Sequence, residues 1–113
     1  MSKLDEKVEQ YVGEVKNTLG MSVDEDLMRK VAKGLGPAIY NNDASKVAGT
    51  DPSEMATVKK NFLMGKLGLA DNDATDAGLN KVMDMYAAKS RTKYRAVVYY
   101  LLTKEFGKEA VYD

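Results

Sequence analysis

The sequence contains neither cysteine nor histidine, and these two absences exclude most of the common site chemistry. Without cysteine the chain has no disulfide, no thiolate nucleophile and no thiolate-bound metal. Without histidine it lacks the commonest general base and the commonest ligand of transition metals. An enzyme made from this chain would depend on carboxylates, or on a serine or tyrosine activated by lysine. We therefore predict no metal site and no cofactor, and the sequence singles out no catalytic residue.

Long hydrophobic runs and an excess of one charge are also missing. The longest apolar run, residues 96–102, is far too short to span a bilayer, and residues 1–7 lack the apolar core of a signal peptide. Seventeen basic and seventeen acidic residues cancel to a formal net charge of zero. This balance argues against bulk attraction to nucleic acid or to an anionic membrane, but it is compatible with a local charged patch. We expect a soluble, cytoplasmic protein with no membrane partner.

The composition of the chain is sufficient for one hydrophobic core. Of the 113 residues, 44% are hydrophobic and 30% are charged, which is an ordinary balance for a folded domain. A chain of this length buries roughly two-thirds of its unfolded surface. We predict a single domain over residues 1–113.

Helix end signals recur along the chain. Four helical runs close on an apolar residue followed by glycine, namely Leu19-Gly20, Leu35-Gly36, Leu67-Gly68 and Phe106-Gly107. Glycine suits the left-handed conformation after a helix because it has no Cβ to penalise positive φ. Together with apolar residues spaced three and four apart, these ends predict an all-α fold, a compact single-domain bundle of about five short helices.

The expected helix starts are polar capping residues. The first helix covers about residues 3–19. The caps of the later helices are Ser22 (with Glu25 three residues on) for the second, Asp51 (before Pro52) for the third, Asp71–Asp73 for the fourth and Ser90 for the fifth. Residues 44–50 are compatible with either a short helical turn or an irregular loop.

Residues 97–102 are six consecutive apolar residues, and on their own they are compatible with a strand. The helical spacing that continues from Tyr94 to Phe106 favours a helix. Because its apolar residues cover more than one face, we expect this fifth helix to be central and packed on two sides.

The segment Asp71-Asn72-Asp73-Ala74-Thr75-Asp76 is rich in carboxylates, like the start of a calcium loop. An EF-hand loop requires glycine at its sixth position and glutamate at its twelfth. Counted from Asp71, those positions hold Asp76 and Val82. We interpret the segment as a helix start, where acidic residues are favoured.

A basic cluster precedes the core of the fifth helix. Lys89, Arg91, Lys93 and Arg95 alternate there without an intervening acidic residue, although a helix N-terminus favours negative charge. Free helix amides and fixed positive charge together form an anion site. The candidate anion-binding residues are Ser90, Arg91, Lys93 and Arg95. Either the cluster is simply solvated, or it is neutralised by an aspartate between Asp71 and Asp76, a phosphate, or an acidic surface on another chain, and these alternatives stay open.

Three longer segments resemble those of a known family. They are Lys93-Tyr94-Arg95-Ala96-Val97-Val98-Tyr99-Tyr100-Leu101-Leu102, Lys33-Gly34-Leu35-Gly36-Pro37-Ala38-Ile39-Tyr40 and Lys59-Lys60-Asn61-Phe62-Leu63-Met64-Gly65-Lys66-Leu67-Gly68-Leu69. Together they resemble the small bacterial proteins grouped as domain of unknown function 2853. The resemblance extends over nearly the whole chain and implies a compact helical bacterial protein. It implies no activity, substrate or catalytic residue.

Three functional hypotheses follow from these observations. The first is a non-enzymatic helical domain that acts through protein–protein binding or self-association, with the acidic segment 71–76 of one copy facing the basic residues 89–95 of another. The second is binding of a phosphate ligand or nucleic acid through residues 89–95, although zero net charge argues against nucleic acid. The third, an enzyme that uses carboxylates or lysine, ranks last.

Overall fold

The structure, a computed structural model, describes residues 2–48 and 51–112, and their regular secondary structure is helical. The predicted all-α fold is confirmed: within these residues there is no strand, and the only β-type pairing is an isolated bridge between Lys46 and Tyr94. No helix in the described part of the chain has the length and apolar character needed to cross a membrane.

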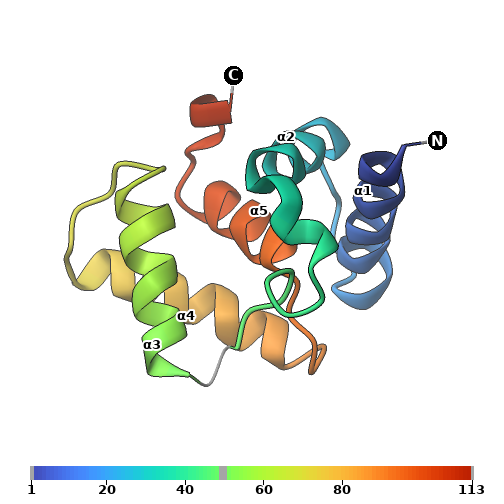
Figure 1. Cartoon of the computed structure of the whole chain (residues 1–113). Helices are drawn as coiled ribbons and strands as arrows, with labels where there is room; N and C mark the ends of the chain where they lie inside the picture. Colours follow the sequence, from blue (N-terminus) through green and yellow to red (C-terminus); the bar gives the residue numbers. More distant parts are fainter. Residues whose placement is uncertain (1, 49–50, 113) are drawn as a thin grey trace.

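Five α-helices lie within the described residues and are arranged as in Figure 1. They are α1 (Lys3–Gly13), α2 (Glu25–Leu35), α3 (Pro52–Thr57), α4 (Asp73–Ala87) and α5 (Arg95–Glu105). Two of them continue as π-helical segments, α1 into Glu14–Thr18 and α3 into Val58–Met64. Two short 3₁₀ segments cover Gly36–Tyr40 and Glu109–Tyr112.

Helix α5 is the central element of the bundle. Figure 1 shows it passing between α1 and α2 on one side and α3 and α4 on the other. Eight consecutive residues, Ala96 to Thr103, are buried, and α5 packs against both α2 and α4. The prediction of a central helix packed on two sides is therefore confirmed. The apolar run that resembled a strand is helical because neighbours cover it all round.

All four predicted glycine ends are confirmed. Gly20, Gly36, Gly68 and Gly107 have φ values of 65°, 63°, 71° and 63°. At Gly36 this conformation ends α2 and redirects the chain into the 3₁₀ segment that carries Tyr40. A side chain there would be strained even though a Cβ would meet no atom within 4 Å.

The predicted cap at Asp51 is also confirmed. Its Oδ1 accepts hydrogen bonds from the Ser53 amide at 2.9 Å and from the Ser53 hydroxyl at 3.0 Å, and Pro52 is the first residue of α3. These hydrogen bonds, that from the Ser53 amide above all, hold the pKa of the Asp51 carboxyl below its usual value.

Replacing Asp51 by alanine is expected to lower the melting temperature by a few degrees, because an amide in the first turn of α3 loses its acceptor. The pKa of the Asp51 carboxyl is lower in the folded protein than in the unfolded chain, so the ionised carboxylate stabilises the fold at pH values above the unfolded pKa. This stabilisation is lost as the pH falls through the folded pKa. Melting curves at pH 7 and pH 2 check both points. An equal difference between the wild-type protein and Asp51→Ala at the two pH values would contradict the ionic nature of the cap.

The predicted start of the second helix was wrong. Ser22 does not cap it: α2 begins at Glu25, and Asp24 is its cap, with Oδ1 accepting from the Leu27 amide at 3.1 Å. The Asp24 amide in turn donates to the Tyr100 hydroxyl of α5 at 2.8 Å. A contact with the central helix thus determines which of two capping residues is used.

The predicted start of the fifth helix was wrong as well. Helix α5 begins at Arg95, and its first flanking residue, Tyr94, provides no side-chain cap. Ser90 instead closes a small turn with Thr92, accepting from its amide and donating to its carbonyl. Tyr94 is extended and forms an isolated bridge with Lys46 in the loop of residues 41–48.

That pairing also determines the conformation of much of the undecided stretch 44–50. The Val47 amide donates to the Lys93 carbonyl at 2.8 Å, and the Arg95 amide donates to the Ser45 carbonyl at 2.7 Å. Turns occupy residues 42–45 ahead of this bridge. Residues 49 and 50 lie outside the described residues.

Candidate functional site

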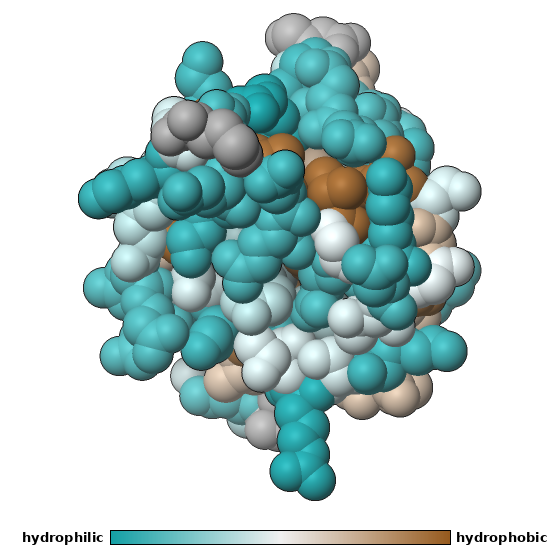
Figure 2. All heavy atoms as spheres, turned by 90° about the vertical axis from the view of Figure 1, so that its right-hand side faces the viewer, coloured by the Kyte–Doolittle hydropathy of each residue, from teal (hydrophilic) through white to brown (hydrophobic). Residues whose placement is uncertain are grey.

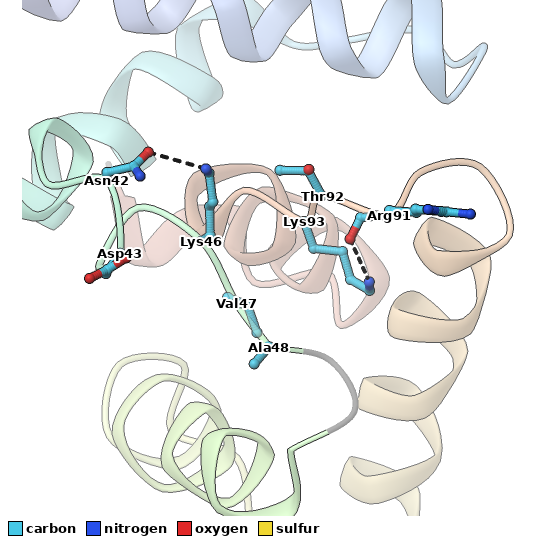
Figure 3. Close-up of a pocket in the computed structure, with 8 residues that line it drawn as sticks. All are labelled: Asn42, Asp43, Lys46, Val47, Ala48, Arg91, Thr92 and Lys93. Carbon is cyan, nitrogen blue, oxygen red and sulfur yellow. Dashed lines mark hydrogen bonds between the residues drawn. The ribbon is translucent and has the colours of Figure 1, made fainter.

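Two of the four predicted anion-binding residues, Arg91 and Lys93, lie at a surface hollow of about 300 Å³. Figure 3 shows this Arg91 hollow between the loop of residues 42–48 and the segment that leads into α5. The residues that line it are Asn42, Asp43, Lys46, Val47, Ala48, Arg91, Thr92 and Lys93. The backbone pairing of Val47 with Lys93 holds the two sides together.

Positive charge predominates in the Arg91 hollow. Lys46, Arg91 and Lys93 are cationic, and Asp43 is the one carboxylate in the lining. The Lys46 ammonium donates to Asn42 Oδ1 at 3.1 Å. Lys93 is only 9% exposed, and its ammonium donates to the Arg91 carbonyl at 3.3 Å. The exposed Arg91 guanidinium has no hydrogen bond or ion pair with any residue that the structure describes. Figure 3 shows its side chain extending away from Lys46 and from the loop of residues 42–48.

The other two predicted residues do not join this cluster. Ser90 is occupied by its own turn, and Arg95 is directed into the protein. The Arg95 guanidinium donates to the Ala44 carbonyl at 2.9 Å, and it forms an ion pair with Glu54 of α3. The Arg95 amide is also taken, by the Ser45 carbonyl. The Arg95 amide is therefore not free to bind an anion, and Arg95 ties the loop of residues 41–48 to α5 and α3.

The acidic segment does not neutralise the basic cluster either. Asp71 and Asp76 both form ion pairs with Lys59 of the π-helical segment after α3. The hydrogen bonds that the Lys59 ammonium donates to these two carboxylates, that to Asp71 above all, raise the pKa of Lys59. Asn72 caps α4 by accepting from the Thr75 amide at 3.0 Å, which confirms the interpretation of this segment as a helix start.

A second hollow, of about 180 Å³, adjoins the Arg91 hollow and shares Asn42 and Lys46 with it. We call it the Tyr40 hollow. The residues that line it are Lys7, Gln10, Ile39, Tyr40, Asn41, Asn42, Ser45, Lys46 and Tyr94. Two of these side chains are cationic and none is a carboxylate. No sequence signal indicated this hollow, because α1, the 3₁₀ segment and the two paired loops come together only in the fold.

The larger hollow between α1 and α2 is a weaker candidate. It measures about 500 Å³ and is lined by Asp5, Val8, Glu9, Val12, Glu25 and Arg29. Its only cation, Arg29, is already paired with Asp5 at 2.6 Å. Figure 2 shows the face that α1 covers to be largely hydrophilic, with only small hydrophobic areas between polar side chains. Three carboxylates line this hollow against one paired cation, so it offers no site for an anion, and no broad apolar surface marks another ligand there.

A metal centre is not indicated by the arrangement of the described residues. Among residues 2–48 and 51–112, no three acidic side chains are grouped so that they could hold a metal ion. The seven methionines and seven tyrosines of the sequence supply no strong ligand in their place.

Comparison with known proteins identifies the family of the chain, but the description of that family names no activity. A family model described as "Protein of unknown function (DUF2853)" matches residues 10–110, which is most of the chain. None of the curated proteins matches the chain.

Proposed function

The chain belongs to the DUF2853 family, whose description assigns no activity, and we propose that it is a non-enzymatic binding domain that recognises an anionic group at the Arg91 hollow. The observation that carries this proposal is the charge of the hollow. Two loops bring three cations to it against one carboxylate, and the Arg91 guanidinium lacks a partner among the described residues. A guanidinium is well suited to bind phosphate or carboxylate oxygens in pairs.

The lining of the hollow supports binding rather than catalysis. Its one hydroxyl side chain, Thr92, makes no hydrogen bond to a carboxylate or an amine of the described residues, so no activated nucleophile is present. The buried Lys93 ammonium is fixed by the Arg91 carbonyl and contributes charge beneath the surface.

Inorganic phosphate is expected to raise the melting temperature of the wild-type protein by several degrees more than chloride at equal ionic strength, because a ligand that binds only the folded state stabilises it. Arg91→Ala should lose most of this difference. The control is Lys60→Ala, which removes an exposed cation outside both hollows. Multivalent anions also stabilise proteins by exclusion from their surfaces, so the comparison between variants carries the test. An equal phosphate response in Arg91→Ala and Lys60→Ala would overturn the proposal.

A protein partner, including a second copy of the chain, is the second candidate, because carboxylates satisfy the same guanidinium. It is favoured by the exposed Asp73, which makes no ion pair among the described residues, whereas Asp71 and Asp76 are already paired with Lys59. Sedimentation of the same proteins distinguishes this case. Self-association of the wild-type protein that Arg91→Ala abolishes, without a phosphate response, would identify the anionic group as a carboxylate of another copy.

A further inference from the structure

The Tyr40 hollow extends the Arg91 hollow with a surface that presents hydrogen-bond donors and an aromatic ring. Lys7 and Lys46 come from α1 and from the loop of residues 41–48, and no carboxylate lines this hollow. Lys7 is half-buried and makes no ion pair with a described residue. A ligand that fills the hollow must therefore bring acceptor oxygens, because unpaired donors and cations are costly when they are covered.

The two asparagines of the hollow are held as donors. Asn41 Oδ1 accepts from the amides of Asp43 and Ala44, both at 2.9 Å, and Asn42 Oδ1 accepts from the Lys46 ammonium at 3.1 Å. Each carbonyl oxygen is thus occupied, while each side-chain NH₂ group has no hydrogen bond with a described residue. Such groups donate to the carbonyl oxygens and ring nitrogens of a heterocycle, or to phosphate oxygens.

The ring at the edge of this hollow is unusually exposed for a large side chain. Tyr40 is 47% exposed, and Met21 is the only other large hydrophobic residue in the described chain that is comparably exposed. Tyr40 ends the 3₁₀ segment Gly36–Tyr40 and lines the hollow together with the asparagines and Lys46. An aromatic face next to cations is the combination that binds nucleotides, since bases stack on aromatic rings while phosphates pair with cations.

We propose that the Arg91 hollow and the Tyr40 hollow form one site for a nucleotide, with the phosphate at the cations around Lys46 and the base stacked on Tyr40. This inference rests on the proposed function, because it specifies the anionic ligand of the same surface. Each hollow by itself is small, at about 300 and 180 Å³, and the shared Lys46 and Asn42 lie between the two. The zero net charge of the chain favours a single nucleotide over a long polymer, whose binding draws on widespread positive charge.

Calorimetric titration with four probes tests this site: inorganic phosphate, uridine, uridine monophosphate and an eight-residue oligouridylate. We expect the monophosphate to bind more tightly than phosphate or uridine alone. Tyr40→Ala should weaken monophosphate binding roughly tenfold, as expected for loss of a stacking platform, and leave phosphate binding unchanged. Tyr40→Phe keeps the ring and should bind nearly as well as the wild-type protein. Lys7→Ala should weaken monophosphate binding several-fold.

The controls are matched to each variant. Met21→Ala removes the other exposed large hydrophobic residue, and Lys60→Ala removes a lysine outside both hollows. Equal affinity for phosphate and the monophosphate, or no effect of Tyr40→Ala, would overturn the nucleotide inference and leave the anion site intact. Binding of none of the four probes would overturn both. Tighter binding of the oligouridylate than of the monophosphate would contradict a single-nucleotide ligand and show that the ligand is a strand.

Discussion

Replacing Arg95 by alanine is expected to destabilise the protein by about 3 kcal/mol, since it breaks a largely buried ion pair and leaves several acceptors unpaired. The Arg95 side chain is only 16% exposed and that of Glu54 only 24%. The guanidinium also donates to the Ala44 carbonyl at 2.9 Å, to the Lys46 carbonyl at 3.3 Å and to the Tyr99 hydroxyl at 3.3 Å. Chemical denaturation at neutral pH measures the loss.

Arg91→Ala is the matched control for this experiment. It removes the same side chain four residues earlier, where the guanidinium is exposed and has no partner among the described residues. Its effect on stability should stay within about 0.5 kcal/mol, as for most surface substitutions. If the two variants had equal stability, Arg95 would not connect α5 to the loop of residues 41–48. A loss of stability in Arg95→Ala alone would separate the two arginines of the basic cluster. Arg95 then acts in the fold, which leaves Arg91 available for ligand binding.

Tyr86→Phe is expected to cost about 2 kcal/mol, because the Tyr86 hydroxyl makes a buried hydrogen bond to a charged group. It donates to Glu14 Oε2 at 2.6 Å and accepts from the Tyr94 amide at 3.3 Å, so it joins α4 to the π-helical segment after α1 and to the start of α5. Burial, together with the hydrogen bond to Glu14, raises the pKa of Tyr86, so the phenol remains a donor at pH values where an ordinary tyrosine ionises. Urea denaturation of the variant gives the cost.

Tyr11→Phe is the matched control for Tyr86→Phe, and the two substitutions should have opposite effects. Both tyrosines are fully buried, but the Tyr11 hydroxyl has no hydrogen-bond partner among the described residues, and its ring packs against Tyr94 with centroids 5.6 Å apart. Burial raises the pKa of Tyr11 to about 12. Removing an unsatisfied hydroxyl should leave stability unchanged or raise it by up to about 1 kcal/mol. Equal losses for Tyr86→Phe and Tyr11→Phe would contradict the difference in their partners.

Two of the eight residues that line the Arg91 hollow could be predicted from the sequence. Arg91 and Lys93 were recognisable because the alternation of basic residues lies within one short segment. Arg95 belongs to the same alternation, and no local signal separates it from Arg91. The difference arises because Glu54 and the carbonyls of the loop of residues 41–48 surround Arg95, more than forty positions away in the chain. Lys7 and Tyr40 could not be assigned to the site for the same reason.

The sequence by itself determined the features that depend on neighbours within one or two helical turns. The helical class follows from apolar spacing, the four glycine ends from backbone sterics, the Asp51 cap from hydrogen bonds to Ser53, and the central position of α5 from apolar residues all round it. Each of these needs no information about distant segments.

The tertiary structure alone decided where two helices begin, which cations are paired, and where the hollows lie. Asp24 replaces Ser22 as a cap through its contact with Tyr100, and Lys59 rather than the basic cluster neutralises Asp71 and Asp76. In each case several local choices have similar free energies. A contact between segments far apart in the chain then selects one of them, because a partner that removes an unpaired charge or amide outweighs a small local preference.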